Sequence, residues 1–236
     1  MKSGKSSLYD DLKRQILTME LDPDEDLDEV TISEKYGLSR TPVRDIFRRL
    51  AGEGYIDIRE NRGARVIPLN HATLRNFFLV APMIYAAIGR LAVQNFKPKQ
   101  LADLVETQER FRRASLHFET LAMVLENNKF HEIMGEMSAN VYLQPSLRRL
   151  LVDHARIGHT FFHPRNDDMR QRLKIAVEHH DAFIEALKAH DEAGVVDLVF
   201  RHWELSRENM ELYVAPGDMK ADFPLELASS VVRSGR

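Results

Sequence analysis

The chain has 236 residues and a formal net charge of −3, with 44% hydrophobic and 29% charged residues, a composition typical of a soluble globular protein of one or two domains. It contains no cysteine, which excludes disulfides and cysteine-ligated metal sites. No apolar run approaches membrane-spanning length and the N-terminus lacks a signal-peptide pattern, so we expect a cytoplasmic protein that does not bind a membrane.

The charges are unevenly distributed along the first third of the chain. Eight acidic residues and no lysine or arginine lie between Glu20 and Glu34, whereas seven arginines and four acids lie between Ser39 and Arg65. For nucleic-acid binding this distribution matters more than the net charge, and it allows a basic surface on an acidic protein. The modest excess of arginine predicts weak non-specific DNA binding that falls steeply with salt.

Three short helices are predicted before residue 51. The first covers residues 8–19 and the second residues 31–36, and Gly37 supplies the bend before the third. Either Ser39 or Thr41 serves as the N-cap of the third helix. The second and third helices with the bend between them have the pattern of a helix-turn-helix.

The third helix has one apolar face and one arginine face. Apolar side chains recur at the i, i+3, i+4 and i+7 positions Val43, Ile46, Phe47 and Leu50. Thr41, Arg44 and Arg48 point the other way. Because a guanidinium group can bind phosphate or both acceptors on a guanine edge, this face suits the major groove of DNA.

Residues 55–67 have the pattern of a β-hairpin. Tyr55–Arg59 and Arg65–Ile67 alternate apolar and polar side chains, and the turn between them carries Arg62 and Gly63 at its tip. A hairpin with a basic tip is the wing of a winged helix, and we expect Arg62 and Gly63 to lie along a minor groove or the DNA backbone. Solvated arginines beside an ordinary hairpin are the alternative interpretation, which the order of these features disfavours.

The run from Ser39 to Arg44, followed by Leu50, Gly54 and Gly63, resembles the DNA-binding domain of GntR-type bacterial transcription regulators over roughly residues 8–70. The resemblance implies five DNA-contacting residues: Ser39, Arg40, Thr41, Arg44 and Gly63. Arg48 and Arg62 join them from the helix face and the wing tip. The family often has an arginine where this chain has Val30, so one of its DNA contacts is expected to be missing here.

A second, all-helical region follows the hairpin. From His71 onward the sequence shows only helical periodicity, with helices predicted at residues 71–95, 98–115, 118–138, 144–162, 167–190 and 192–214. Their short connections imply antiparallel neighbours. We therefore predict a mainly α protein in which a winged helix-turn-helix domain (residues 1–70) precedes an antiparallel helical bundle (residues 71–215) and a tail (residues 216–236).

Three predicted bundle helices each turn polar ligands toward the bundle interior. His180 and His202 are centred in apolar stripes, and Asn127 and His131 share one face of a third helix. Neutral imidazole is a common ligand of transition metals. A single such histidine is more often a hydrogen-bonded core residue, but three on neighbouring helices make a metal or polar-ligand site an equal alternative.

The pattern of Asn127, Phe130 and His131, followed by His180 and His202, resembles the metal-binding pattern of the FCD effector domain, which follows the winged helix in the FadR-like branch of GntR regulators. The resemblance implies a divalent transition metal, zinc or nickel, held by Asn127, His131, His180 and His202. The family typically has aspartate at the first position. Asn127 brings no charge, so we expect weaker metal binding or a greater need for an anionic effector.

FCD domains often carry an arginine and a glutamate one turn apart on the first bundle helix, where this chain has Val80 and Ile84. Tyr85, Asn140 and Arg156 are therefore the alternative polar contacts for an effector, which we expect to be a carboxylate or a sugar acid.

The leading functional hypothesis is a transcription regulator, a repressor whose affinity for operator DNA is controlled by a small-molecule effector at the metal-containing bundle. A homodimer is expected, because two recognition helices about one DNA turn apart read a palindrome. One alternative is a DNA-binding dimer with a purely structural bundle. The other is a hydrolytic enzyme with a three-histidine metal, which we disfavour because no residue set for catalysis is visible.

Overall fold

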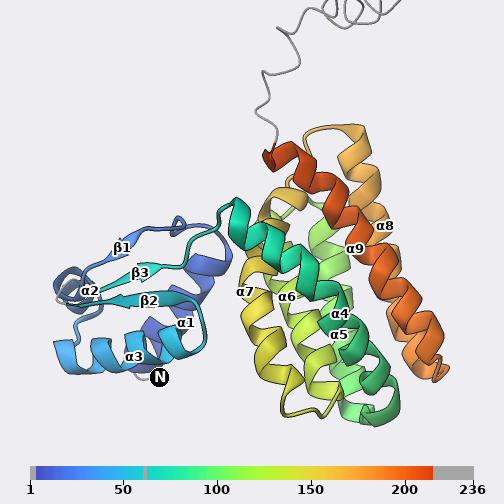
Figure 1. Cartoon of the computed structure of the whole chain (residues 1–236), viewed down its shortest axis with the longest axis horizontal. Coiled ribbons are helices and arrows are strands. Elements are labelled where there is room, and N and C mark those ends of the chain that lie inside the picture. The colour runs from blue at the N-terminus through green and yellow to red at the C-terminus, as the bar shows by residue number, and fades with distance from the viewer. Residues whose placement is uncertain (1–3, 61–62, 215–236) are drawn as a thin grey trace, which may run out of the picture.

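The computed structural model describes residues 4–60 and 63–214, which form two lobes (Figure 1). We call them the head and the bundle. The head is built, in chain order, from α1 (Gly4–Leu17), β1 (Asp26–Leu27), α2 (Glu29–Tyr36), α3 (Arg40–Gly52), β2 (Ile56–Arg59) and β3 (Gly63–Val66). The predicted tail at residues 216–236 lies outside the described residues.

Local interactions fix the helix-turn-helix. The Asp28 carboxylate caps α2 by accepting hydrogen bonds from the backbone N–H groups of Val30 and Thr31. α2 ends at Gly37, whose φ of 62° is a left-handed conformation that glycine adopts without strain. Ser39 is the N-cap of α3, although its side chain makes no capping hydrogen bond. The predicted apolar face of α3 is confirmed, because Val43, Ile46, Phe47 and Leu50 are all buried.

The predicted hairpin is present, and a third strand joins it. β3 pairs antiparallel with both β1 and β2, in the order β1-β3-β2. The Arg65 guanidinium holds the Asp26 carboxylate across the β1–β3 pair with contacts of 2.6 and 2.9 Å. At Gly63 a Cβ atom would lie 2.3 Å from the Leu27 carbonyl oxygen, so only glycine lets β1 approach the wing this closely.

The bundle consists, in the described residues, of six helices that agree closely with the predicted ones. They are α4 (His71–Asn95), α5 (Pro98–Leu116), α6 (Thr120–Met137), α7 (Leu143–Phe161), α8 (Asp167–Lys188) and α9 (Glu192–Val214). α4 packs against α6, α7 and α9, and α5 packs against α6 and α8. α4 is long and apolar enough to span a membrane by length and composition, but its packing within the bundle makes this weak evidence for a membrane helix.

The head rests on the side of the bundle formed by α6 and α7 (Figure 1). One continuous cluster of buried apolar side chains joins the two lobes, with Leu8 and Ile16 of α1 in the same cluster as Val152 and Ala155 of α7. The Arg156 side chain is fully buried at this junction, where its Nη1 donates to the Ile67 carbonyl oxygen at 3.1 Å. Head and bundle are therefore packed together as one body in this structure.

Candidate DNA-binding cleft and buried histidine cluster

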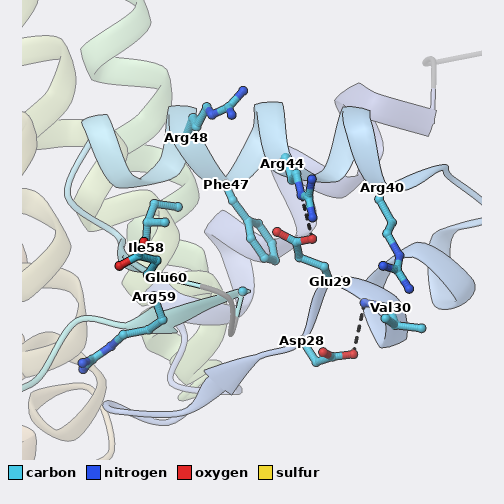
Figure 2. A pocket seen from close by; sticks show the side chains of 11 residues that line it. Asp28, Glu29, Val30, Arg40, Arg44, Phe47, Arg48, Ile58, Arg59 and Glu60 are labelled. Carbon is cyan, nitrogen blue, oxygen red and sulfur yellow. Dashed lines mark hydrogen bonds and ion pairs between the residues drawn. The ribbon is translucent and has the colours of Figure 1, made fainter.

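An open cleft of about 470 Å³ separates α3 from the wing in the head (Figure 2). The start of α2, the exposed face of α3 and the strands around the wing form its walls. It is lined by Asp28, Glu29, Val30, Arg40, Arg44, Phe47, Arg48, Ile58, Arg59, Glu60 and Gly63. Four arginines against three acids give the cleft a small excess of positive charge, as the sequence predicts for this part of the chain.

The structure brings most of the predicted DNA-contacting residues to this cleft. Arg40, Arg44, Arg48 and Gly63 line it. Ser39 and Thr41 are exposed at the beginning of α3, next to Arg40 in the chain. The remaining predicted contact, Arg62, lies outside the described residues.

The Glu29 side chain contacts α3, the predicted recognition helix. This contact was not predicted from the sequence. Its Oε2 accepts a hydrogen bond from Arg44 Nε at 2.8 Å, which Figure 2 shows as a dashed line across the cleft. Glu29 is the first residue of α2 and Arg44 lies on α3, so the pair depends on the angle between the two helices. Because the two residues are brought together only when α2 and α3 pack, no pattern in the sequence indicates the ion pair.

The three predicted histidine ligands meet in the interior of the bundle. Ligand atoms of His131 (α6), His180 (α8) and His202 (α9) all lie within 4.8 Å of one another, and all three side chains are buried. Burial lowers the pKa of His180 to about 3 and the pKa values of His131 and His202 well below their ordinary range. The three imidazoles are therefore neutral at physiological pH, the form that binds a metal.

A nitrogen of each imidazole is buried without a hydrogen-bond partner: His131 Nε2, His180 Nε2 and His202 Nδ1. Leaving a buried polar atom unsatisfied costs about 1–3 kcal/mol, so three together call for a ligand. A zinc ion binds imidazole at about 2.0–2.1 Å, so two of its ligand atoms are at most about 4.2 Å apart. A small inward shift of the rings would fit the cluster around one ion, and the donor set suits a transition metal.

Gln108 on α5 orients the His180 ring. Its Nε2 donates to the Val177 carbonyl oxygen at 3.0 Å and to Asp181 Oδ1 at 2.9 Å, which fixes the orientation of the amide. Its Oε1 lies 3.0 Å from His180 Nδ1 and accepts a hydrogen bond from the N–H there, which leaves the Nε2 lone pair directed at the cluster. Metal-binding histidines are commonly oriented in this way through their second nitrogen. Gln108 was not predicted from the sequence.

A fourth histidine, His154 on α7, also belongs to the cluster. Its ring centroid lies 4.8 Å from that of His131, and its Nδ1 is 2.7 Å from the Tyr85 hydroxyl. Together with Asn127 and His202 it lines a small void on one side of the cluster, which places Asn127 near the histidines as predicted. His154 was missed, although it lies on the apolar stripe of Leu147, Leu151 and Phe161, the same signal that identified His180.

A second cavity adjoins the cluster, and the walls are mostly aromatic and aliphatic. It is lined by Tyr85, Ile88, Phe130, His131, Met134, Leu147, Phe183, Val199, His202 and Trp203. Its open space is about 20 Å³, enough for one water-sized group. Of the predicted effector contacts, Tyr85 lies here.

The structure does not bring Asn140 or Arg156 to this cavity. The Asn140 side chain accepts hydrogen bonds from the backbone N–H groups of Tyr142 and Leu143 at 3.0 Å each, so it stabilises the turn before α7. Arg156 points from α7 toward the head and contacts Ile67. The direction of both side chains depends on how the helices pack, which the sequence pattern does not fix.

The sequence matches two family models. Residues 5–66 match the model described as bacterial regulatory proteins of the gntR family, and residues 83–205 match the FCD domain. The first match contains α2, α3 and the wing, and the second contains all four histidines of the cluster.

Individual relatives agree with these matches. The transcriptional repressor RspR of Escherichia coli K12 is 25% identical over 205 residues, which cover 86% of this chain and 87% of RspR. The uncharacterised regulator YdhC of Bacillus subtilis is 24% identical over 187 residues, covering 77% of this chain and 83% of YdhC. The solved structure of E. coli McbR/YncC has the same fold, with a TM-score of 0.73 at 23% identity over 91% of this chain and 98% of that one.

Proposed function

We propose that this chain, which belongs to the GntR family of bacterial regulatory proteins and carries an FCD domain, is a repressor. Its family makes it a DNA-binding transcription regulator rather than an enzyme. In this proposal a homodimer binds operator DNA in the cytoplasm, and a metal and a small-molecule effector in the bundle control its affinity. Repression is supported by the relative RspR, whose name describes it as a repressor.

The arrangement of Arg40, Arg44 and Arg48 along the open cleft carries the DNA-binding part of the proposal. They occupy the face of α3 opposite its buried side, so α3 can enter a major groove without disturbing the core. Residues on the wing flank the same cleft and suit the neighbouring DNA backbone. The small excess of positive charge favours weak non-specific binding, so two heads are needed for high operator affinity.

Selection of duplexes from a random pool by the full-length protein tests this assignment. We expect a palindromic site, and we expect Arg44→Ala to weaken binding to it roughly tenfold or more, the loss expected for one base-contacting arginine. Arg201→Ala is the matched control, because Arg201 is a similarly exposed arginine on α9, which belongs to the bundle. Equal binding by the Arg44→Ala and Arg201→Ala variants would show that the cleft is not the contact surface.

The metal part of the proposal is supported by the three unpartnered imidazole nitrogens. His131, His180 and His202 would hold zinc or nickel, with Asn127 as a neutral oxygen ligand. The ion would join α6, α8 and α9 and supply a positive charge that an anionic effector can bind. The family pattern implies that an aspartate at residue 127 would bind the metal more tightly, because a carboxylate offsets part of its charge.

Metal content of the purified protein after incubation with zinc and dialysis tests the site. We expect about one equivalent per chain in the native protein, a loss with His180→Ala and a weaker site, by about 10- to 100-fold, with Gln108→Leu, which removes the hydrogen bond to His180. His117→Ala is the control, since His117 is exposed at the end of α5. Metal content unchanged by His180→Ala would refute the assignment of this histidine cluster as the metal site.

The cavity beside the cluster is the proposed effector site. A carboxylate suits the metal end, while the aromatic and aliphatic walls favour an apolar body over a sugar acid, whose hydroxyls would lack hydrogen-bond partners. An effector larger than a water-sized group requires the walls to separate, because the open space is only about 20 Å³. Binding would therefore shift helices, which is the change a regulator needs.

Trp203 provides a direct readout of effector binding, because it is the sole tryptophan of the chain and lines the cavity. We expect zinc-loaded protein to change its tryptophan fluorescence on titration with small aromatic or aliphatic carboxylates. Sugar acids of similar size are expected to give a weaker response. A response to sugar acids alone would contradict this choice of effector class.

A further inference from the structure

Two exposed apolar side chains lie in the DNA-binding cleft. Val30 is 38% exposed and Ile58 is 51% exposed, and they are the exposed large hydrophobic residues of the head within residues 6–60 and 63–70. Single exposed apolar residues are common on protein surfaces. These two, however, both line the arginine-bearing cleft rather than lying scattered over the head. Phosphate contacts alone would not use apolar side chains, so each of these two should meet an apolar group of DNA.

Val30 is held at the Arg40 end of the cleft (Figure 2). Its backbone N–H donates to Asp28 Oδ1 at 3.1 Å, and this N-cap fixes the beginning of α2. Ile58 lies on β2 of the wing, at the other end of the cleft, beside Arg59 and Glu60. The two side chains therefore face different parts of a bound duplex.

Recognition helices of this kind contact base edges through their N-terminal residues, and Arg40 is the first residue of α3. The apolar group that a base pair presents in the major groove is the C5-methyl group of thymine. We propose that Val30 contacts the C5-methyl group of a thymine in each operator half-site and makes the protein specific for thymine there. This inference rests on the proposed operator binding, and it assigns a specificity-determining residue that the DNA-contacting arginines do not provide.

Ile58 has a different expected partner. A wing lies along the backbone or the minor groove, and no thymine methyl group is accessible in the minor groove. Ile58 packs against deoxyribose and contributes to binding without preferring a base. The chain thus offers a matched pair of exposed apolar residues in one cleft, of which only Val30 reads a base.

Substitution of deoxyuridine for thymine tests the inference, because it removes the methyl group and keeps base pairing. The operator is first selected with the native full-length protein, and each thymine is then replaced singly. At one position per half-site we expect binding to fall about three- to fivefold, the value of one buried methyl group. Val30→Ala is expected to bind the thymine and deoxyuridine operators equally. Ile58→Ala is expected to weaken binding to both and to keep the preference for thymine.

The outcomes separate this inference from the function on which it rests. If the native protein selects an operator but binds every deoxyuridine version as well as the original, the inference is wrong and operator binding stands. Retention of the thymine preference by Val30→Ala would also overturn it. If the native protein enriches no duplex, the proposed operator binding fails, and the inference with it.

Discussion

At the scale of single residues, the bundle contains an unusual set of buried neutral imidazoles. Burial lowers the pKa of His154 to about 4, and its Nδ1 is hydrogen-bonded to the Tyr85 hydroxyl. In the unfolded chain the same histidine has an ordinary pKa of about 6.5. Between these two values the unfolded chain binds a proton that the folded chain excludes, so acid favours unfolding.

This difference predicts an acid-sensitive fold in the absence of metal. Each buried histidine is expected to remove up to about 1.4 kcal/mol of unfolding free energy per pH unit below pH 6.5. Urea unfolding at pH 7, 6 and 5 with a chelator present measures this slope. His154→Leu is expected to flatten it by the contribution of one histidine, although loss of the Tyr85 hydrogen bond lowers stability at pH 7. An unchanged slope would mean that His154 is protonated in the folded protein.

At the scale of helices and strands, sequence periodicity was enough to predict a helix wherever one face of the helix is buried and residues such as proline mark its ends. α5 begins at the Lys97-Pro98 break that the sequence displays, whereas the Gln144-Pro145 break lies within the first turn of α7, where proline is tolerated. β1 was not predicted, because its two residues are held by pairing with β3, which leaves no pattern in so short a segment. Asn140 and Arg156, predicted as effector contacts, do not line the cavity beside the cluster, because side-chain direction depends on how helices pack.

The exposed face of α4 leads to a prediction about the proposed homodimer. Leu79, Val80 and Met83 are 62%, 42% and 61% exposed, whereas Phe77 and Ala81 of the same helix are buried. Exposed apolar patches of this kind mark contact surfaces. We expect the double variant Leu79→Glu/Met83→Glu to be monomeric and to lose most of its operator affinity, because two heads are needed.

Light scattering after size-exclusion chromatography would measure the mass of this α4 variant. Leu116→Glu is the control, because Leu116 is 70% exposed at the end of α5. It is expected to leave the dimer intact. A dimeric double variant would show that subunits contact each other elsewhere.

At the scale of the whole molecule, α7 lies on the side of the bundle next to the head and packs against α1 (Figure 1). His154 faces the cluster, whereas Arg156, two residues later, faces the head and donates to the Ile67 carbonyl oxygen. Asp153 lies beside Arg156, with Asp153 Oδ1 3.6 Å from Arg156 Nη1, and burial raises the pKa of its carboxyl group. A displacement of α7 by an effector would therefore move the Arg156 guanidinium group, which links α7 to Ile67 at the end of the head.

We expect Arg156→Met to destabilise the protein, because it removes one of the two guanidinium groups beside the buried Asp153 carboxylate. Arg149 Nη1 remains 3.5 Å from Asp153 Oδ2, so the loss is expected to fall below the value of about 3–5 kcal/mol for a buried charge left without any partner. Adding Asp153→Leu should restore most of this stability, since replacing a buried ion pair by apolar residues is often neutral. Urea unfolding of both variants measures these changes.

The restored double variant then tests coupling between the lobes. It keeps the cleft and the histidine cluster but lacks the hydrogen bond from α7 to Ile67. In the native protein we expect operator affinity to differ between zinc-loaded and chelator-treated samples. In the double variant we expect the two affinities to converge, because coupling between two sites needs a contact that differs between the metal-loaded and the metal-free protein. A metal response as large in the double variant as in the native protein would show that the signal passes through the apolar packing of α1 on α7 instead.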